Sequence, residues 1–131
     1  MTRYLDLGDY LLIAEAVLDI SAERLARLDR IGLAESALQA PAAGFGGIDA
    51  YPEFTTKAAV LCWHLTKNHP LPDGNKRAAF IALRVFVERN GHTWHRSPTD
   101  PEDTDSVIRG VAAGTVGEAE LAEWIRARLS P

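Results

Sequence analysis

Residues 69–77 read His-Pro-Leu-Pro-Asp-Gly-Asn-Lys-Arg, and residues 78–87 continue as Ala-Ala-Phe-Ile-Ala-Leu-Arg-Val-Phe-Val. The second stretch contains a single polar residue, Arg84, so a helix formed by it is apolar nearly all round. Such a helix is usually the buried centre of a larger protein or a membrane span, and this run is too short to cross a bilayer. We therefore predict that residues 78–87 belong to a buried central helix.

The two prolines of the first stretch decide where that helix begins. Pro70 and Pro72 keep the segment extended, because proline fixes its own φ and disfavours helix at the residue before it. The helix can then start only near Asp73 or Gly74. A helix N-terminus presents unpaired N–H groups and a partial positive charge, and both attract anions. The sequence thus predicts an anion site where the extended segment meets the helix.

The residues around this helix start suit the handling of a phosphate group. Lys76 and Arg77 add two positive charges, and Gly74 has no Cβ, so a ligand can approach the backbone closely. Asp73 offers a carboxylate to a hard cation such as Mg²⁺ that is shared with phosphate oxygens. His69 can take up a proton near neutral pH. The alternative is a helix-capping Asp73, a loop histidine and two solvated cations, but capping explains only one of these residues.

These residues resemble the signature of the Fic/Doc family. The loop of its Fic branch reads His-Pro-Phe-x-x-Gly-Asn-Gly-Arg, and that of its Doc branch reads His-x-Phe-x-Asp-x-Asn-Lys-Arg. The chain is similar to the Doc branch at five positions: His69, Asp73, Asn75, Lys76 and Arg77. It departs from the signature at Leu71, where the family usually carries a Phe that anchors the loop in the core.

The resemblance implies a Doc-type toxin of a toxin–antitoxin pair, which transfers the γ-phosphate of ATP to a hydroxyl of elongation factor Tu and so arrests growth. It implies that His69 is the general base for the target hydroxyl and that Asp73 holds Mg²⁺ and the phosphates. Lys76 and Arg77 neutralise charge during the transfer, which depends mostly on positioning and electrostatics. The resemblance also implies that the phosphates are bound by the residues at the helix start: Gly74, Asn75, Lys76 and Arg77.

Control of the activity is expected to come from a separate protein. Fic enzymes that restrain themselves carry a Ser/Thr-x-x-x-Glu-Gly/Asn helix, and no glutamate of this chain is followed by Gly or Asn. The Doc resemblance implies a cognate antitoxin whose disordered tail folds onto the toxin as a helix in a groove. We expect no direct nucleic-acid partner and no membrane partner.

Two alternatives to phosphate transfer remain open: a Fic-type transfer of AMP by the same His69, and an inactive member that only binds. Lys76 argues against AMP transfer, because the Fic branch has Gly there and a diphosphate lies against the bare backbone. Phe80 stands where AMP-transferring Fic enzymes usually carry a second Arg, and we interpret it as an apolar core residue. The intact set of five motif residues argues against an inactive member.

The composition of the chain fits one soluble domain. Its 131 residues are predicted to form a single Fic/Doc-like domain spanning residues 1–131. A net charge of -4 and a pI of about 5.5 disfavour a protein that coats nucleic acid. Cys62 is the one cysteine and lies on an apolar face, which predicts a buried structural thiol. No signal-peptide pattern is visible, so we expect a cytoplasmic protein.

Apolar residues recur at helical spacing along most of the chain. This spacing predicts helices over roughly 9–19, 31–40, 53–67, 74–90 and 107–114, with a last helix whose inward stripe runs from Leu121 to Leu129. Thr115 and Glu118 are spaced as a capping box for that last helix. Ser97–Asp105 is expected to be an acidic connection and His92–His95 a short extended piece with surface histidines. No strand pattern is long enough for a sheet, so the fold class is all-α.

A glycine-rich loop precedes the third of these helices. Residues 41–47 read Pro-Ala-Ala-Gly-Phe-Gly-Gly, and their glycines permit positive φ. The family resemblance implies a short flap loop or hairpin over the active site, and Phe45–Asp49 is our candidate for it. The alternative is an ordinary surface loop.

Overall fold

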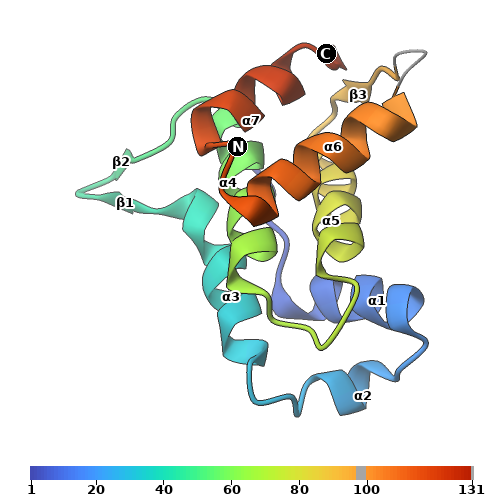
Figure 1. Ribbon diagram of the computed structural model, residues 1–131. Coiled ribbons are helices and arrows are strands. Elements are labelled where there is room, and N and C mark those ends of the chain that lie inside the picture. The colour runs from blue at the N-terminus through green and yellow to red at the C-terminus, as the bar shows by residue number, and fades with distance from the viewer. Residues whose placement is uncertain (97–99, 131) are drawn as a thin grey trace.

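Two antiparallel helices, α4 (Phe54–Asn68) and α5 (Asn75–Arg89), form the centre of an all-α fold in the computed structural model, which describes residues 1–96 and 100–130 (Figure 1). The other helices surround this pair: α1 (Leu7–Leu18), α2 (Ala22–Leu25), α3 (Ile31–Gln39), the 3₁₀ turn η1 (Ala40–Ala42), α6 (Asp100–Ala113) and α7 (Glu118–Arg126). The strands are two residues long and form two antiparallel pairs: β1 (Gly44–Phe45) with β2 (Ile48–Asp49), and β3 (Thr93–Trp94) with β4 (Leu129–Ser130).

The prediction of a buried central helix is confirmed. Small side chains on both central helices are fully buried, among them Ala58 and Ala59 of α4 and Ala78 and Ala82 of α5. Alanines at the contact allow the two backbones to approach closely, because few side-chain atoms separate them. The larger Phe86 of α5 is also fully buried and stacks on Phe54 of α4 and on Tyr4, which precedes α1. The loop between α4 and α5 is thereby fixed at one end of a rigid core.

α1 is joined to the central pair by an ion pair at the far end of α5. Arg89 Nη1 lies 2.8 Å from Asp9 Oδ2, and both side chains are about two-thirds or more buried. The Arg89 guanidinium lowers the pKa of the Asp9 carboxyl to about 2. Asp9 also completes a capping box with Asp6, which starts α1 two residues earlier than the apolar spacing predicts.

The C-terminal third departs from two expectations. The connection predicted for Ser97–Asp105 is wrong from Asp100 onward, because α6 begins there; Pro101 is tolerated in the first turn, where its missing N–H costs no helical hydrogen bond. Residues 97–99 of that prediction lie outside the described residues. The predicted capping box is also wrong, since the N-cap residue of α7 is Gly117, which makes no side-chain hydrogen bond, and the Thr115 hydroxyl instead donates to the Gly110 carbonyl.

The extended piece predicted near His92–His95 is confirmed as β3. It pairs with β4, so Leu129 lies in a strand opposite Trp94 and does not extend the last helix. The His95 N–H donates to the Arg128 carbonyl at 2.7 Å, so the chain that follows α7 pairs with this strand and does not continue as a helix. His95 is exposed, whereas His92 is half-buried and stacks on Phe54 at 4.3 Å between ring centroids.

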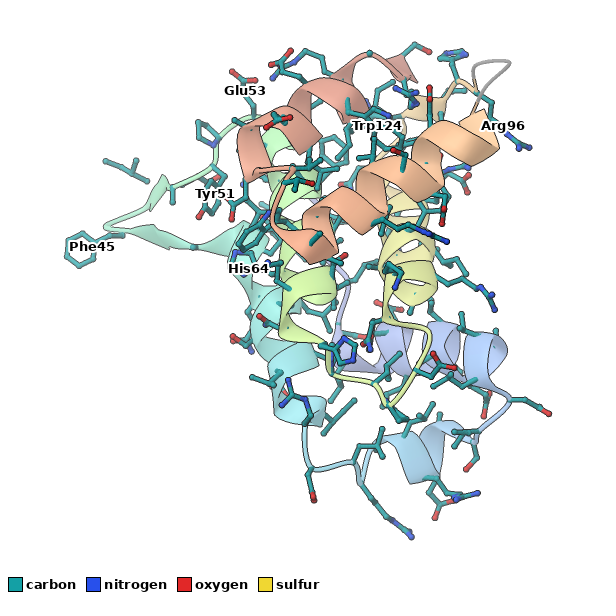
Figure 2. All side chains as sticks on the ribbon, in the orientation of Figure 1. Phe45, Tyr51, Glu53, His64, Arg96 and Trp124 are labelled. Carbon is teal, nitrogen blue, oxygen red and sulfur yellow. The ribbon has the colours of Figure 1, made fainter. Side chains whose placement is uncertain are left out.

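The candidate flap is a β-hairpin. Gly46 and Gly47 form its turn with φ values of 60° and 80°, a conformation that favours glycine at both positions. Its base is held by the buried Lys57, whose Nζ lies 3.1 Å from Asp49 Oδ2. The hairpin projects to the side of α3 and α4, with Phe45 at its outer end pointing away from the helices (Figures 1 and 2). The predicted hairpin is therefore present, and its covering of the site stays a prediction.

The remaining global expectations concern Cys62 and the membrane. Cys62 is fully buried in α4, and burial raises the pKa of its thiol to about 12, so the prediction of a structural thiol is confirmed. Within residues 1–96 and 100–130, we find no helix with the length and apolar character needed to span a membrane.

Candidate active site

The loop between α4 and α5 is closed by one side chain. Asn75 is 5% exposed, and its carboxamide makes two hydrogen bonds to the backbone of Leu71. The Leu71 N–H donates to Asn75 Oδ1 at 2.9 Å, and Asn75 Nδ2 donates to the Leu71 carbonyl at 2.9 Å. The Leu71 side chain is 1% exposed, so Leu anchors this loop in the core where the family signature has Phe. Sequence assigned Asn75 to phosphate binding; the structure shows its amide bound to the loop, and direct phosphate contact stays a prediction.

Replacing Asn75 tests this closure. Asn75→Ala leaves the buried N–H and C=O of Leu71 without partners, and we expect the free energy of unfolding to fall by about 2–3 kcal/mol. Urea denaturation measures the loss. Asn90→Ala is a matched control, because Asn90 makes the same two bonds to the backbone of Arg3 at the other, more exposed end of α5. An equal and small loss in both variants would contradict the role of Asn75 as the buried closure of the loop.

The first turn of α5 presents backbone N–H groups that no side chain caps. Gly74 is the N-cap residue, and the first helical hydrogen bond runs from the Ala78 N–H to the Gly74 carbonyl at 2.9 Å. The amides of residues 75–77 therefore precede the helical hydrogen-bond ladder. Asp73 does not cap them, because its Oδ1 accepts from the Gly74 N–H at 2.8 Å. The predicted start of the helix is confirmed, and the start retains the features of an anion site.

Gly74 is required for a reason other than the one the sequence suggested. Its φ is 72°, in the left-handed region that favours glycine. A Cβ at Gly74 would also lie 2.9 Å from Cγ1 of Val17 in α1. The missing side chain thus allows α1 to pack against the loop, while a close approach of a ligand to the Gly74 backbone stays a prediction.

A cleft of about 630 Å³ opens beside this helix start and runs along α5 toward α6. Four cationic side chains line it, and only two carboxylates do. Its lining comprises Val17, Leu18, Asp73, Gly74, Lys76, Arg77, Phe80, Arg84, Arg96, Thr104, Asp105 and Ile108. Arg77 and Arg84 are seven residues apart on α5, so about 10 Å of helix separates these two positive charges along the cleft. The cleft is thus suited to an elongated anion that lies along α5.

Phe80 lines this cleft and also packs against the edge of the core. It is half-buried and meets the Trp94 ring edge-on at 5.8 Å between centroids. Our prediction of an apolar core residue at this position is therefore confirmed in part, because the ring packs against the core but also lines the cleft. Arg84 was noted in the sequence as the one polar residue of an apolar helix, but only the structure assigns it to the cleft, where it lies over the Trp94 ring at 5.1 Å.

His69 lies outside the cleft lining. It is the exposed C-cap residue of α4, with φ 52° and ψ 55°, and it precedes the loop that Asn75 closes. The structure therefore brings Asp73, Lys76 and Arg77 together in the cleft, places His69 on the surface at the start of the same loop, and buries Asn75 within it. Because it is exposed, His69 is accessible to a macromolecular substrate.

The metal prediction rests on Asp73 alone. Asp73 is exposed and lines the cleft next to the helix start. Within residues 1–96 and 100–130, no three His, Cys, Asp or Glu side chains are grouped so as to hold a metal by themselves. Mg²⁺ commonly binds through one or two carboxylates together with substrate phosphates. A single carboxylate such as Asp73 fits an ion that is shared with the phosphates of a nucleotide, and Mg²⁺ binding stays a prediction.

Comparison with known proteins identifies relatives of this architecture. A model of the Fic/DOC family matches residues 4–87, a range that includes α1 and the whole motif. The chain is 40% identical over 91 residues to a protein named Toxin Doc from Mycolicibacterium smegmatis (strain ATCC 700084 / mc(2)155). The alignment covers 70% of this chain and 67% of that protein. The family match ends before α6, so the cleft residues from Arg96 onward lie beyond it.

Proposed function

Because the chain belongs to the Fic/DOC family, we propose that it is a Doc-type toxin that transfers the γ-phosphate of ATP to a hydroxyl of elongation factor Tu. The observation that carries this proposal is the position of Lys76 in the cleft beside the uncapped first turn of α5. A long cationic side chain there occupies the space that a diphosphate would need against bare backbone. It favours a pose in which the terminal phosphate faces the nucleophile.

The chemical step uses the groups around the loop. His69 takes the proton of the target hydroxyl, and the hydroxyl oxygen forms a bond to the γ-phosphorus. The bond from that phosphorus to the β–γ bridging oxygen breaks, and ADP leaves. The amides at the start of α5, with Lys76 and Arg77, stabilise the charge that spreads over the phosphate oxygens. Asp73 would hold Mg²⁺, which neutralises charge on the phosphates.

Labelled ATP tests the proposal and separates it from its alternatives. The pure protein is incubated with γ-labelled or α-labelled ATP and elongation factor Tu. Label from the γ position alone supports phosphate transfer, and label from the α position supports transfer of AMP. No label on the protein substrate, despite nucleotide binding, would indicate an inactive binder and overturn the proposed activity.

We also propose a cognate antitoxin as the restraint on this activity. The name of the similar Toxin Doc supports a toxin–antitoxin pair, and no glutamate of the chain has the sequence context of an inhibitory helix. Co-expression with the neighbouring small open reading frame is expected to restore growth and to give a complex on size exclusion, in which a tail helix occupies a groove of the toxin. Full toxicity without a complex would contradict this.

A further inference from the structure

We propose that Arg30 is a positioning residue for His69. Arg30 lies in the segment between α2 and α3, and its guanidinium binds the two backbone carbonyls that precede and follow the Cα of His69. Arg30 Nη2 donates to the Asn68 carbonyl at 2.8 Å, and Arg30 Nε donates to the His69 carbonyl at 3.0 Å. The role rests on the proposed function, since it acts through the proposed general base.

The carbonyls at the end of α4 need hydrogen-bond donors from elsewhere, because a proline follows His69. The last four carbonyls of a helix lack helical partners, and they are usually satisfied by N–H groups of the next residues. Pro70 follows His69 and has no N–H to donate. The two donors of Arg30 take over this function, and a positive charge at a helix C-terminus is also favourable toward the helix dipole.

The backbone of His69 has a conformation that requires support. Among the described residues, only Asp19 and His69 combine a side chain with a positive φ. Asp19 is held by a hydrogen bond from its own N–H to the Glu15 carbonyl at 2.9 Å. For His69, the bond that the structure shows at this turn is the one its carbonyl accepts from Arg30. Arg30 therefore stabilises the left-handed conformation that sets the direction of the imidazole.

Two further contacts fix the backbone around His69 in addition to the hydrogen bonds from Arg30. Asn68 Nδ2 donates to the Leu33 carbonyl at 3.0 Å, which ties the end of α4 to the first turn of α3. After His69, the buried Leu71 is fixed by Asn75. His69 is thus held by Arg30 on one side and by the closed loop on the other. Loss of Arg30 releases the first support while the cleft residues stay in place.

The side chains of this segment offer a matched control. Arg30 is exposed, so its replacement is not expected to unfold the protein. Arg27 lies three residues earlier, is 73% exposed, and pairs with Glu23 within its own segment. Arg27→Ala removes the same type of side chain without touching α4. Arg30→Lys keeps the charge but lacks the two-pronged geometry of a guanidinium.

Kinetics of phosphate transfer give the first test. We expect Arg30→Ala to lower kcat about 10-fold to 100-fold, because a small misplacement of a catalytic group has effects of that size. KM for ATP should stay within about twofold, since no cleft residue changes. Arg30→Lys should have a kcat between those of Arg30→Ala and the wild type. Added guanidinium ion should recover part of the kcat that Arg30→Ala loses. Arg27→Ala should have the kcat of the wild type. An unchanged kcat in Arg30→Ala would overturn the proposal.

An NMR measurement separates this inference from the proposed function. The imidazole signals of His69, assigned with His69→Ala, should shift or broaden in Arg30→Ala and stay unchanged in Arg27→Ala. The NMR measurement needs no transferase activity. If the wild-type protein proved inactive, the proposed function would be overturned, and the NMR signals of His69 would still decide whether Arg30 positions it. His69 signals identical to the wild type in a folded Arg30→Ala protein would overturn the positioning role.

Discussion

A folded His69→Ala protein is expected to lose phosphate transfer by about 100-fold or more and to no longer arrest growth. A general base contributes about that factor or more, because without it the hydroxyl must lose its proton to water. His69 is exposed and stands directly before the loop that carries Asp73. Transfer rates on elongation factor Tu and growth of cells that express the variant are the two measurements.

The control for this variant is a histidine within α4. His64 is five residues earlier, half-buried, and its Nε2 lies 3.3 Å from Glu118 Oε1 of α7 (Figure 2). His64→Ala removes an imidazole from α4 and is expected to keep full activity after a small loss of stability. Thermal unfolding confirms that both variants are folded. Growth arrest of normal potency by folded His69→Ala would show that His69 is not the base.

Local sequence rules predicted the centre of the fold well. The run from Ala78 to Val87 has one polar residue and becomes the buried α5, and the prolines before it limit where that helix begins. These features depend on a few neighbouring residues, so they can be derived without tertiary contacts. The motif residues that line the cleft, Lys76 and Arg77, follow from the same local geometry.

Contacts between residues far apart in the chain could not be predicted from the sequence. Nothing near Arg30 indicates that it caps a helix 38 residues later, because the contact exists only once α3 packs beside α4. The spacing of Thr115 and Glu118 fits a capping box, yet Glu118 pairs with His64 across the helix interface. The sequence alone could not show whether the side-chain amide of Asn75 closes the loop or binds a ligand. Tertiary contacts decide each of these cases.

The second large effect is expected at Lys76. Lys76→Gly should lower phosphate transfer about 10-fold to 100-fold, because it removes a charge that faces the transferred group and opens the backbone to a diphosphate. Lys76→Ala is the matched control, since it removes the charge and keeps a Cβ. Lys76 is exposed in the first turn of α5, where glycine disturbs the helix little. Rates with γ-labelled and α-labelled ATP measure both reactions.

The half-buried position of Phe80 makes a stronger form of this test available. Phe80 lines the cleft three residues after Arg77, so an arginine at this position can reach the cleft. We expect Lys76→Gly combined with Phe80→Arg to gain transfer of AMP, while Phe80→Arg alone keeps phosphate transfer because Lys76 still obstructs the diphosphate. Transfer of AMP by the wild-type protein, with Lys76→Gly changing only its rate, would overturn the phosphate-transfer assignment and leave the family assignment intact.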